Sequence, residues 1–280
     1  MRIPRELAEA WRHEPDWLED LPRLAAECSE MWDLRLEPPL DTPRSLVIPA
    51  GKAVLKLNAP SHFEADHEAE ALARWEGVGA VRLLARDDSR RALLCERCRP
   101  GTRLWDAGVD ETIVVTKLLG RLSHKPASPH PFRFLADEAR RWAEEAPTRY
   151  EIGGMPFERS LIEVAVDVFR SVDDRAAYLV NQDLHGANIL QAEREPWLVI
   201  DPKPLVGERE MDGVGLLRNA VVGGKSSVSA CRWLDVLHDF GLDRERLRGW
   251  GVAHALAWGW NAERGWSTWS IDVARAILAA

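Results

Sequence analysis

Three oxygen-bearing side chains stand close together in the second half of the sequence. Asp183 follows the short apolar run 178–180, Asn188 comes five residues later, and Asp201 ends the apolar run 197–200. If both runs are strands of one hairpin, the three groups converge there. Carboxylate and amide oxygens are the ligands that Mg²⁺ prefers, and a carboxylate not bound to metal can accept an alcohol proton. A polar hairpin with Asx turns is the structural alternative, which the spacing of all three residues disfavours.

A second pair of charged residues lies in the first third of the chain. Lys56 stands within an otherwise apolar predicted strand, and a lysine in such a place needs a partner or a phosphate. Glu68 follows on a predicted helix, where it shares a face with Leu72 and Trp75, whereas Glu70 points about 200° away. The pattern therefore predicts a pair of Lys56 with Glu68 rather than two separate surface charges.

Together these residues match the logic of kinases: a strand lysine paired with a helix glutamate, a loop aspartate with an asparagine five residues on, and a metal-binding aspartate after the next strand. The motifs at 183–190 and 192–207 are similar to those of the aminoglycoside/hydroxyurea antibiotic resistance kinases, as are residues 77–84 and 11–32. The first motif is shared by many small-molecule kinases. The stretch Glu-Arg-Glu-Pro-Trp at 193–197 is much more specific.

The resemblance implies an α+β, two-lobed protein-kinase-like fold that transfers the γ-phosphate of ATP to a hydroxyl. It gives a role to each residue of the two groups: Asp183 is the catalytic base, Asn188 and Asp201 hold Mg²⁺, Lys56 orients the α- and β-phosphates, and Glu68 positions Lys56. It also makes Glu96-Arg97-Cys98 the hinge whose backbone contacts adenine.

The sequence departs from the family pattern in two places. The turn at 40–45 has no glycine, whereas kinase phosphate loops usually offer glycine amides to the phosphates. The grip on ATP is therefore expected to depend on Lys56, Ser45 and the metal. The chain has Asn181-Gln182 where many relatives have a histidine, which affects only the packing of the loop before Asp183.

The remaining periodicity predicts the elements that position these residues. Helices are expected within 5–33, at 63–75, 110–124, 132–145, 156–170, 247–263 and 270–279, and strands at 46–48, 53–57, 81–84 and 92–95. The order of strands and helix before residue 98 indicates a small α+β lobe. We therefore expect a nucleotide-binding lobe at 1–98 and a helical lobe with the acceptor site at 99–280. Residues 223–226 resemble the end of a phosphate-binding loop but lack its first glycine and are read as a flexible loop.

The acceptor is the least determined part of the sequence. Acidic residues follow Asp201 and recur near the C-terminus, and they include Glu208, Glu210, Asp212 and Glu263, with Trp260 beside the last. The resemblance places acceptor contacts in this lobe, where these acids would bind a cationic, streptomycin-like aminoglycoside by charge-assisted hydrogen bonds. A solvated acidic surface is the structural alternative. A kinase of hydroxyurea, a sugar or an amino sugar fits the same scaffold, and so does a silent nucleotide-binding pseudokinase.

Composition narrows the class of partner. The 280 residues include 37 Lys and Arg against 45 Asp and Glu, so the net charge is −8, and the longest basic run is a pair. An acidic chain repels phosphate backbones, which disfavours nucleic acid and anionic membranes and favours a small cationic molecule. No apolar run approaches the length of a spanning helix or of a signal peptide. We expect a cytoplasmic monomer or weak homodimer.

Overall fold

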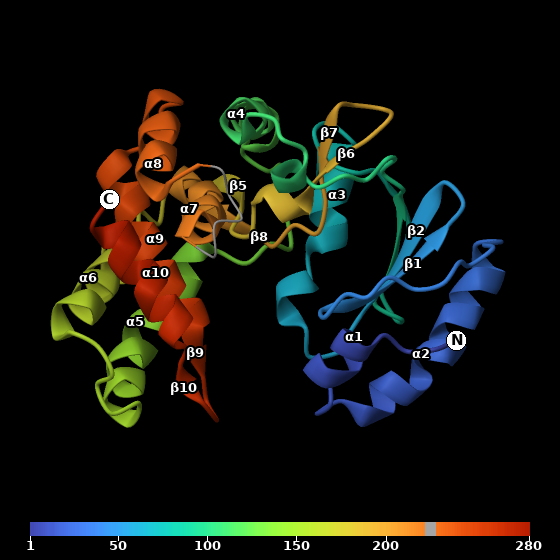
Figure 1. Ribbon diagram of the computed structural model, residues 1–280, viewed down its shortest axis with the longest axis horizontal. Helices are drawn as coiled ribbons and strands as arrows, with labels where there is room; N and C mark the ends of the chain where they lie inside the picture. The colour runs from blue at the N-terminus through green and yellow to red at the C-terminus, as the bar shows by residue number, and fades with distance from the viewer. Residues whose placement is uncertain (222–227) are drawn as a thin grey trace. The chain divides into compact units, whose positions relative to one another are not determined.

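The computed structural model describes residues 1–221 and 228–280. These residues form two compact units. Unit 1 contains Met1–Gly101 and Gln191–Asp201, and unit 2 contains Thr102–Leu190 and Pro202–Ala280. In Figure 1 the second segment of unit 1 carries β7, in yellow to orange, among blue and cyan elements. The segment 191–201 lies in the stretch that the sequence assigned to the C-terminal lobe.

Unit 1 contains an antiparallel sheet in the order β1-β2-β4-β3. Its strands are β1 (Ser45–Ala50), β2 (Ala53–Asn58), β3 (Leu83–Asp87) and β4 (Ala92–Glu96). The predicted hairpin around Gly51 is confirmed, since β1 and β2 pair from Ser45↔Asn58 to Ala50↔Ala53. Gly51 has a φ of 61°, a left-handed conformation that glycine adopts without steric cost.

Side chains of this sheet alternate between two faces, as the twofold period of strands requires. Leu46, Leu55 and Leu57 are fully buried against the N-terminal helices α1 (Arg5–Ala10) and α2 (Pro15–Met31). Figure 1 shows both helices on one side of β1 and β2. Lys56 and Asn58 therefore point to the opposite face, where chemistry is possible.

The opposite face receives the helical segment after β2. This segment starts with the short helix η1 (Phe63–Ala65) and continues as α3 (Glu68–Trp75), so the predicted helix 63–75 is interrupted by a bend. The chain returns to unit 1 through the end of β6 (Ile189–Gln191) and through β7 (Trp197–Val199). Val199 donates its amide to the carbonyl of Gly79 and accepts from Val81, which joins β7 to the segment after α3.

Unit 2 is mainly helical. It contains η2 (Leu104–Asp106), α4 (Glu111–Leu122), α5 (Leu135–Ile152), α6 (Arg159–Arg170), η3 (Gly186–Asn188), η4 (Arg209–Gly213), α7 (Val214–Val221), α8 (Ala230–Asp239), α9 (Arg244–Gly259) and α10 (Thr268–Leu278). Trp233, Trp250 and Phe169 are among its largest fully buried side chains. In the ranges 1–221 and 228–280, helices are too short or too polar to cross a bilayer.

Two short sheets complete unit 2. Strand β5 (Tyr178–Asn181) pairs with β8 (Pro204–Gly207), and β9 (Trp260–Asn261) pairs with β10 (Gly265–Trp266). The expectation that the runs 178–180 and 197–200 form one hairpin is wrong, because β5 takes β8 as its partner and β7 belongs to unit 1. The segment 223–226, expected to be a loop, lies outside the described residues.

Candidate active site

Unit 1 brings together three charged side chains on the face of its sheet that is opposite to α1 and α2. The Lys56 ammonium lies 2.6 Å from Glu68 Oε2 and 2.6 Å from Asp201 Oδ1. Burial lowers the pKa of Lys56, but the negative charges of Asp201 and Glu68 outweigh burial and raise it. The predicted Lys56–Glu68 pair is therefore confirmed, and Asp201 joins it from a segment 145 residues away.

We expect Lys56→Met to destabilise unit 1 strongly. The change leaves the Glu68 carboxylate, only 2% exposed, without its counter-charge. Removing one partner of a buried pair lowers the free energy of unfolding by about 3 to 5 kcal/mol. Urea denaturation measures this, and Lys56→Met combined with Glu68→Leu should regain much of the loss. A single variant as stable as the wild type would contradict the prediction.

Asp201 occupies a special backbone position. Its φ is 50°, in the left-handed region that aspartate and asparagine tolerate better than most residues. It lies at a bend two residues after the end of β7, so the chain turns while its carboxylate is directed at Lys56. The side chain is 28% exposed, so the carboxylate can also meet solvent or a metal ion.

The predicted hinge is held by a residue that local sequence patterns did not single out. Arg194 donates to the Glu96 carboxylate at 2.5 to 3.1 Å and to the carbonyls of Gly77 and Ala80 at 2.6 and 2.9 Å. Arg194 belongs to the specific stretch at 193–197. That stretch therefore ties the end of β4 to the segment after α3.

Most backbone amides of the predicted hinge already donate hydrogen bonds within unit 1. The Glu96 amide donates to Arg82 and the Arg97 amide to Lys52, each at 2.9 Å. Among the described residues, the Cys98 amide has no such acceptor, so it is the one backbone amide of the predicted hinge 96–98 that is not already bonded to a carbonyl. Burial raises the pKa of the Cys98 thiol to about 12, which keeps the thiol protonated.

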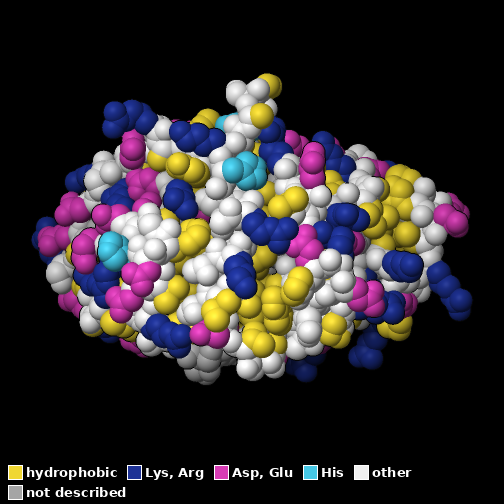
Figure 2. All heavy atoms as spheres, turned by 90° about the horizontal axis from the view of Figure 1, so that it is seen from above, with side chains coloured by type: hydrophobic (Ala, Val, Ile, Leu, Met, Phe, Trp, Pro, Cys, Tyr) yellow, Lys and Arg dark blue, Asp and Glu magenta, His cyan; other side chains and the backbone are white. Residues whose placement is uncertain are grey.

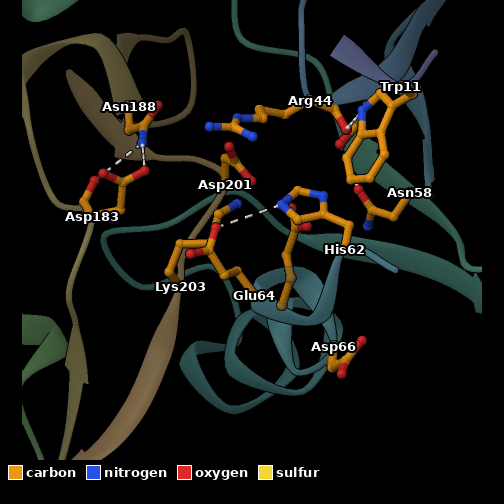
Figure 3. Close-up of polar contacts among 12 residues, drawn as sticks. Trp11, Arg44, Asn58, His62, Glu64, Asp66, Asp183, Asn188, Asp201 and Lys203 are labelled. Carbon is orange, nitrogen blue, oxygen red and sulfur yellow. Dashed lines mark hydrogen bonds and ion pairs between the residues drawn. The ribbon is translucent and has the colours of Figure 1, made fainter. Parts of the chain in front are cut away.

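Unit 2 holds the second group, in the loop after β5. Asn188 Nδ2 donates to the Asp183 carbonyl at 3.1 Å and to its carboxylate at 3.4 Å (Figure 3). These bonds turn the amide oxygen of Asn188 away from Asp183, as a metal ligand requires. Asp183 and Asn188 thus form one local arrangement, as their spacing predicted.

Two nitrogen donors, from His185 and Arg218, bracket the Asp183 carboxylate. His185 Nδ1 accepts from the Ala187 amide, so its Nε2 carries the proton that faces Asp183 Oδ1 at 3.5 Å. Arg218, from α7, donates to the same oxygen. Burial raises the pKa of Asp183, but the hydrogen bond from His185 and the charges of Arg218 and Lys203 outweigh it and lower the pKa to about 2.

The loop is fixed from behind by residues that sequence reasoning treated only as packing. Asn181 Oδ1 accepts from the amides of Asp183 and Lys203, at 3.1 and 2.9 Å, and so ties the loop to the residue before β8. Gly215 allows α7 to approach, because a Cβ there would overlap the carbonyl oxygen of Leu184. The signal for Asn181 was its place two residues before Asp183; neither Arg218 nor Gly215 carried a local signal.

Known proteins resemble this chain over most of its length. The sequence profile of the aminoglycoside/hydroxyurea antibiotic resistance kinases matches residues 37–265. The chain belongs to this family. It is 32% identical to a streptomycin 6-kinase of Streptomyces griseus, covering 91% of this chain and 89% of that protein. It is 34% identical to a hydroxyurea phosphotransferase of Kitasatospora aureofaciens, covering 91% and 78%.

A solved structure shows the same fold at low identity. A choline kinase from Streptococcus pneumoniae superimposes with a TM-score of 0.63 at 12% identity, covering 92% of this chain and 98% of that one. The same kinase has been solved with AMP bound. The expected α+β, protein-kinase-like fold is therefore confirmed, and this member of the resistance kinase family is a small-molecule kinase acting on a hydroxyl.

Ser45 has a different place from the one that the sequence suggested for this kinase. It is 3% exposed, and its hydroxyl donates to Asn58 Oδ1 at 2.6 Å, across the pair of strands β1 and β2. The hydroxyl is thereby committed to a contact within the sheet. It fixes the end of the glycine-free turn and is not presented to a phosphate.

Glu208 and Glu210 were expected to contact the acceptor as part of an exposed wall of acidic residues, but both have structural partners in this kinase. Glu208 is 7% exposed and binds Arg246 through both oxygens, with further bonds from the Trp250 indole and the Asp173 amide. Glu210 accepts from the Asp243 amide at the start of α9. Glu208 is therefore saturated by neighbours, which corrects the expectation of an exposed wall.

Asp212 is also buried rather than exposed. It is 5% exposed and accepts the amide of Asn181 at 2.7 Å, directly behind the loop that carries Asp183. Burial raises the pKa of Asp212 to about 7, although the hydrogen bond from Asn181 lowers it. Asp212 therefore supports the loop that carries Asp183 and is enclosed by the protein, which corrects the expectation that it contacts an acceptor.

Asp212→Asn is expected to make the stability of the kinase less dependent on pH. Because the pKa rises from 3.8 in the unfolded chain to about 7, the folded state holds the extra proton between these values. Stability therefore falls as the pH rises through this window and levels off above it. Asparagine keeps the acceptor oxygen for Asn181 without a charge, so the variant should be more stable than the wild type at pH 8.

Urea denaturation at pH 5 and pH 8 measures this difference. Asp239→Asn, which changes an exposed acid in the same unit, is the matched control and should behave as the wild type. Unchanged pH dependence in Asp212→Asn would contradict the assignment.

Trp260 and Glu263 lie on the β9–β10 hairpin. Trp260 packs against Trp266, with ring centroids 5.3 Å apart, and is half-buried. Glu263 is exposed, and its amide donates to Asn261. Of the predicted acceptor acids, Glu263 is thus the exposed one, whereas Glu210 is half-buried.

Proposed function

We propose that this chain transfers the γ-phosphate of ATP to a hydroxyl of a streptomycin-like aminoglycoside and thereby confers resistance. The observation that carries the proposal is the similarity to streptomycin 6-kinase over about nine-tenths of the chain, together with an intact set of kinase residues. Unit 1 would bind the nucleotide and unit 2 the acceptor. The protein would act in the cytoplasm as a monomer or weak homodimer.

Asp201 and Asn188 would hold Mg²⁺. Each donor suits this ion, because Asp201 offers a partly exposed carboxylate, Asn188 offers an amide oxygen turned away from Asp183, and hard oxygen ligands suit Mg²⁺. When bound, the ion neutralises charge that develops on the phosphates. Among the residues of the chain, Lys56 would orient the α- and β-phosphates, and Glu68 would hold Lys56 in place.

Asp183 would orient the acceptor hydroxyl and accept its proton. The low pKa keeps the carboxylate ionised at neutral pH, so it can always accept a hydrogen bond. Phosphoryl transfer passes through a loose transition state in which positioning contributes most, so a weak but well-oriented base suffices. Arg218 and His185 limit the orientations of Asp183.

Nucleotide binding has support from the fold. The choline kinase with the same fold binds AMP, and an aminoglycoside phosphotransferase of this fold was solved with ADP and hygromycin B. The Cys98 amide would contact adenine in this chain. Arg194 would keep the hinge in position by its bonds to Glu96.

The preference for a cationic acceptor follows from charge. The chain has a net charge of −8, and streptomycin carries guanidinium groups that form charge-assisted hydrogen bonds with carboxylates. Glu263 is the exposed candidate, with Trp260 as a neighbouring apolar surface. Phosphorylation of hydroxyurea is the second candidate function, favoured by the 34% identity to hydroxyurea phosphotransferase.

An ATP-consumption assay with streptomycin, hydroxyurea and neutral sugars tests the proposal. Streptomycin should be turned over with the highest kcat/KM, and mass spectrometry should find one phosphate added. Faster turnover of hydroxyurea would favour the second function. Turnover of neutral sugars as efficient as that of streptomycin would contradict a cationic preference, and no turnover with ATP at all would contradict the kinase itself.

A further inference from the structure

The turn between Leu40 and Ser45 lacks the glycine amides that usually hold phosphates, yet it is fixed in place. Leu40 donates to Val47 at 2.9 Å, and the Thr42 hydroxyl donates to the Ser45 carbonyl at 2.7 Å. The Trp11 indole donates to the Arg44 carbonyl at 3.0 Å. The backbone of Arg44 is therefore anchored by a largely buried tryptophan from the N-terminal helical segment.

The side chain of Arg44 differs from those of most arginines of unit 1. On the face drawn in Figure 2, basic and acidic side chains are interspersed, and unit 1 arginines such as Arg23 and Arg90 bind carboxylates at 2.7 to 2.8 Å. Arg44 is exposed, and within 1–221 and 228–280 its guanidinium makes no hydrogen bond or ion pair. Figure 3 shows this guanidinium pointing toward Asp201, which belongs to the same unit.

The negative charge around Lys56 favours a second cationic side chain for binding a polyphosphate. Lys56 is in contact with both Glu68 and Asp201, so these three residues carry a net negative charge. A polyphosphate approaching them meets one ammonium that is already bound on two sides. An arginine fork binds phosphate oxygens in a bidentate manner, which a loop without glycine amides does not offer through its backbone.

We propose that Arg44 binds the β- and γ-phosphates of the nucleotide and replaces the glycine amides of the phosphate loop. The inference rests on the proposed function, because it assumes that the chain binds ATP. Trp11 acts as a positioning residue, since it fixes the Arg44 carbonyl from the core. The acceptor is cationic and gains nothing from Arg44, so the effect is confined to the nucleotide.

Calorimetric titration of ATP, ADP and AMP, each with Mg²⁺, tests this assignment in Arg44→Ala, Arg44→Lys and the wild type. Arg44→Ala should weaken ATP binding about 10-fold or more, as expected for lost charge-assisted bonds, and leave AMP binding unchanged. Arg44→Lys should fall between the two, because lysine keeps the charge but not the fork. Arg35→Ala, which removes another exposed arginine of unit 1, is the matched control and should bind as the wild type.

Each remaining outcome is decisive. Equal ATP affinity in Arg44→Ala and the wild type would overturn the role of Arg44 while leaving the proposed function intact. An equal loss for AMP and ATP would overturn it too, since it would indicate a displaced loop rather than a lost phosphate contact. A changed KM for streptomycin with an unchanged KM for ATP would assign Arg44 to the acceptor instead. A wild-type protein that binds no ATP would overturn both the inference and the proposed function.

Discussion

Asp183→Asn should lower kcat with the acceptor by about 10² or more, the scale of general-base catalysis. Asparagine has nearly the same shape but cannot accept the proton of the hydroxyl. It also weakens the hold of Arg218 and His185, which both face the same carboxylate oxygen. Because Asp183 does not contact the nucleotide in the proposed mechanism, ATP affinity should stay close to the wild-type value.

Steady-state kinetics and calorimetry separate the two effects. Asp174→Asn changes an exposed acid of unit 2 and is the matched control, so its kcat should equal that of the wild type. If Asp183→Asn retained most of its turnover on a confirmed substrate, Asp183 would not be the base. If it lost ATP binding in parallel, the change would have disturbed more than the base.

Asp201→Asn is expected to abolish measurable turnover and to remove most of the Mg²⁺ dependence of ATP binding. Asparagine suits this position because it tolerates the left-handed backbone, where alanine would be strained. The fold should therefore survive while the negative charge that attracts the ion is lost. Lys56 keeps Glu68 as its partner, so the buried pair remains intact.

Titration of ATP with and without Mg²⁺ measures this loss. The wild type should bind the magnesium complex at least about 10-fold more tightly than free ATP, and the variant should show nearly equal affinities. Asp88→Asn, at an exposed turn of unit 1, is the control. An unchanged preference for the magnesium complex in Asp201→Asn would remove Asp201 from the metal site.

Side-chain contacts that depend on local periodicity could be predicted from the sequence. Lys56 and Glu68 were predicted to pair because a strand face and a helix face can be read from residue spacing, and the structure confirms it. The α+β fold followed from the order of elements and the family resemblance. Asn188 reached Asp183 because only five residues separate them.

The parts that failed depend on tertiary partners. The partner of β5 is β8 rather than the run at 197–200, since pairing is decided by which unit each segment joins. Glu208 and Asp212 were interpreted as surface charges because their partners are distant in the sequence. Glu208 binds Arg246 and Trp250 of α9. Asp212 binds the amide of Asn181, at the end of β5. Local sequence patterns cannot distinguish a solvated carboxylate from a carboxylate that is enclosed by an arginine and an indole.

The return of the chain to unit 1 at Gln191–Asp201 determines when this unit can form during synthesis. The ribosome has made every residue of the sheet long before it makes Arg194 and Asp201. Glu96 therefore waits for a partner 98 residues later, and Lys56 waits for one 145 residues later. Closing so long a loop is slow compared with local folding. A fragment ending at Gly101 lacks these residues, and it also lacks Val199, whose backbone groups pair with Gly79 and Val81. Lys56 thus gains its full set of contacts only after about half of unit 2 has been translated.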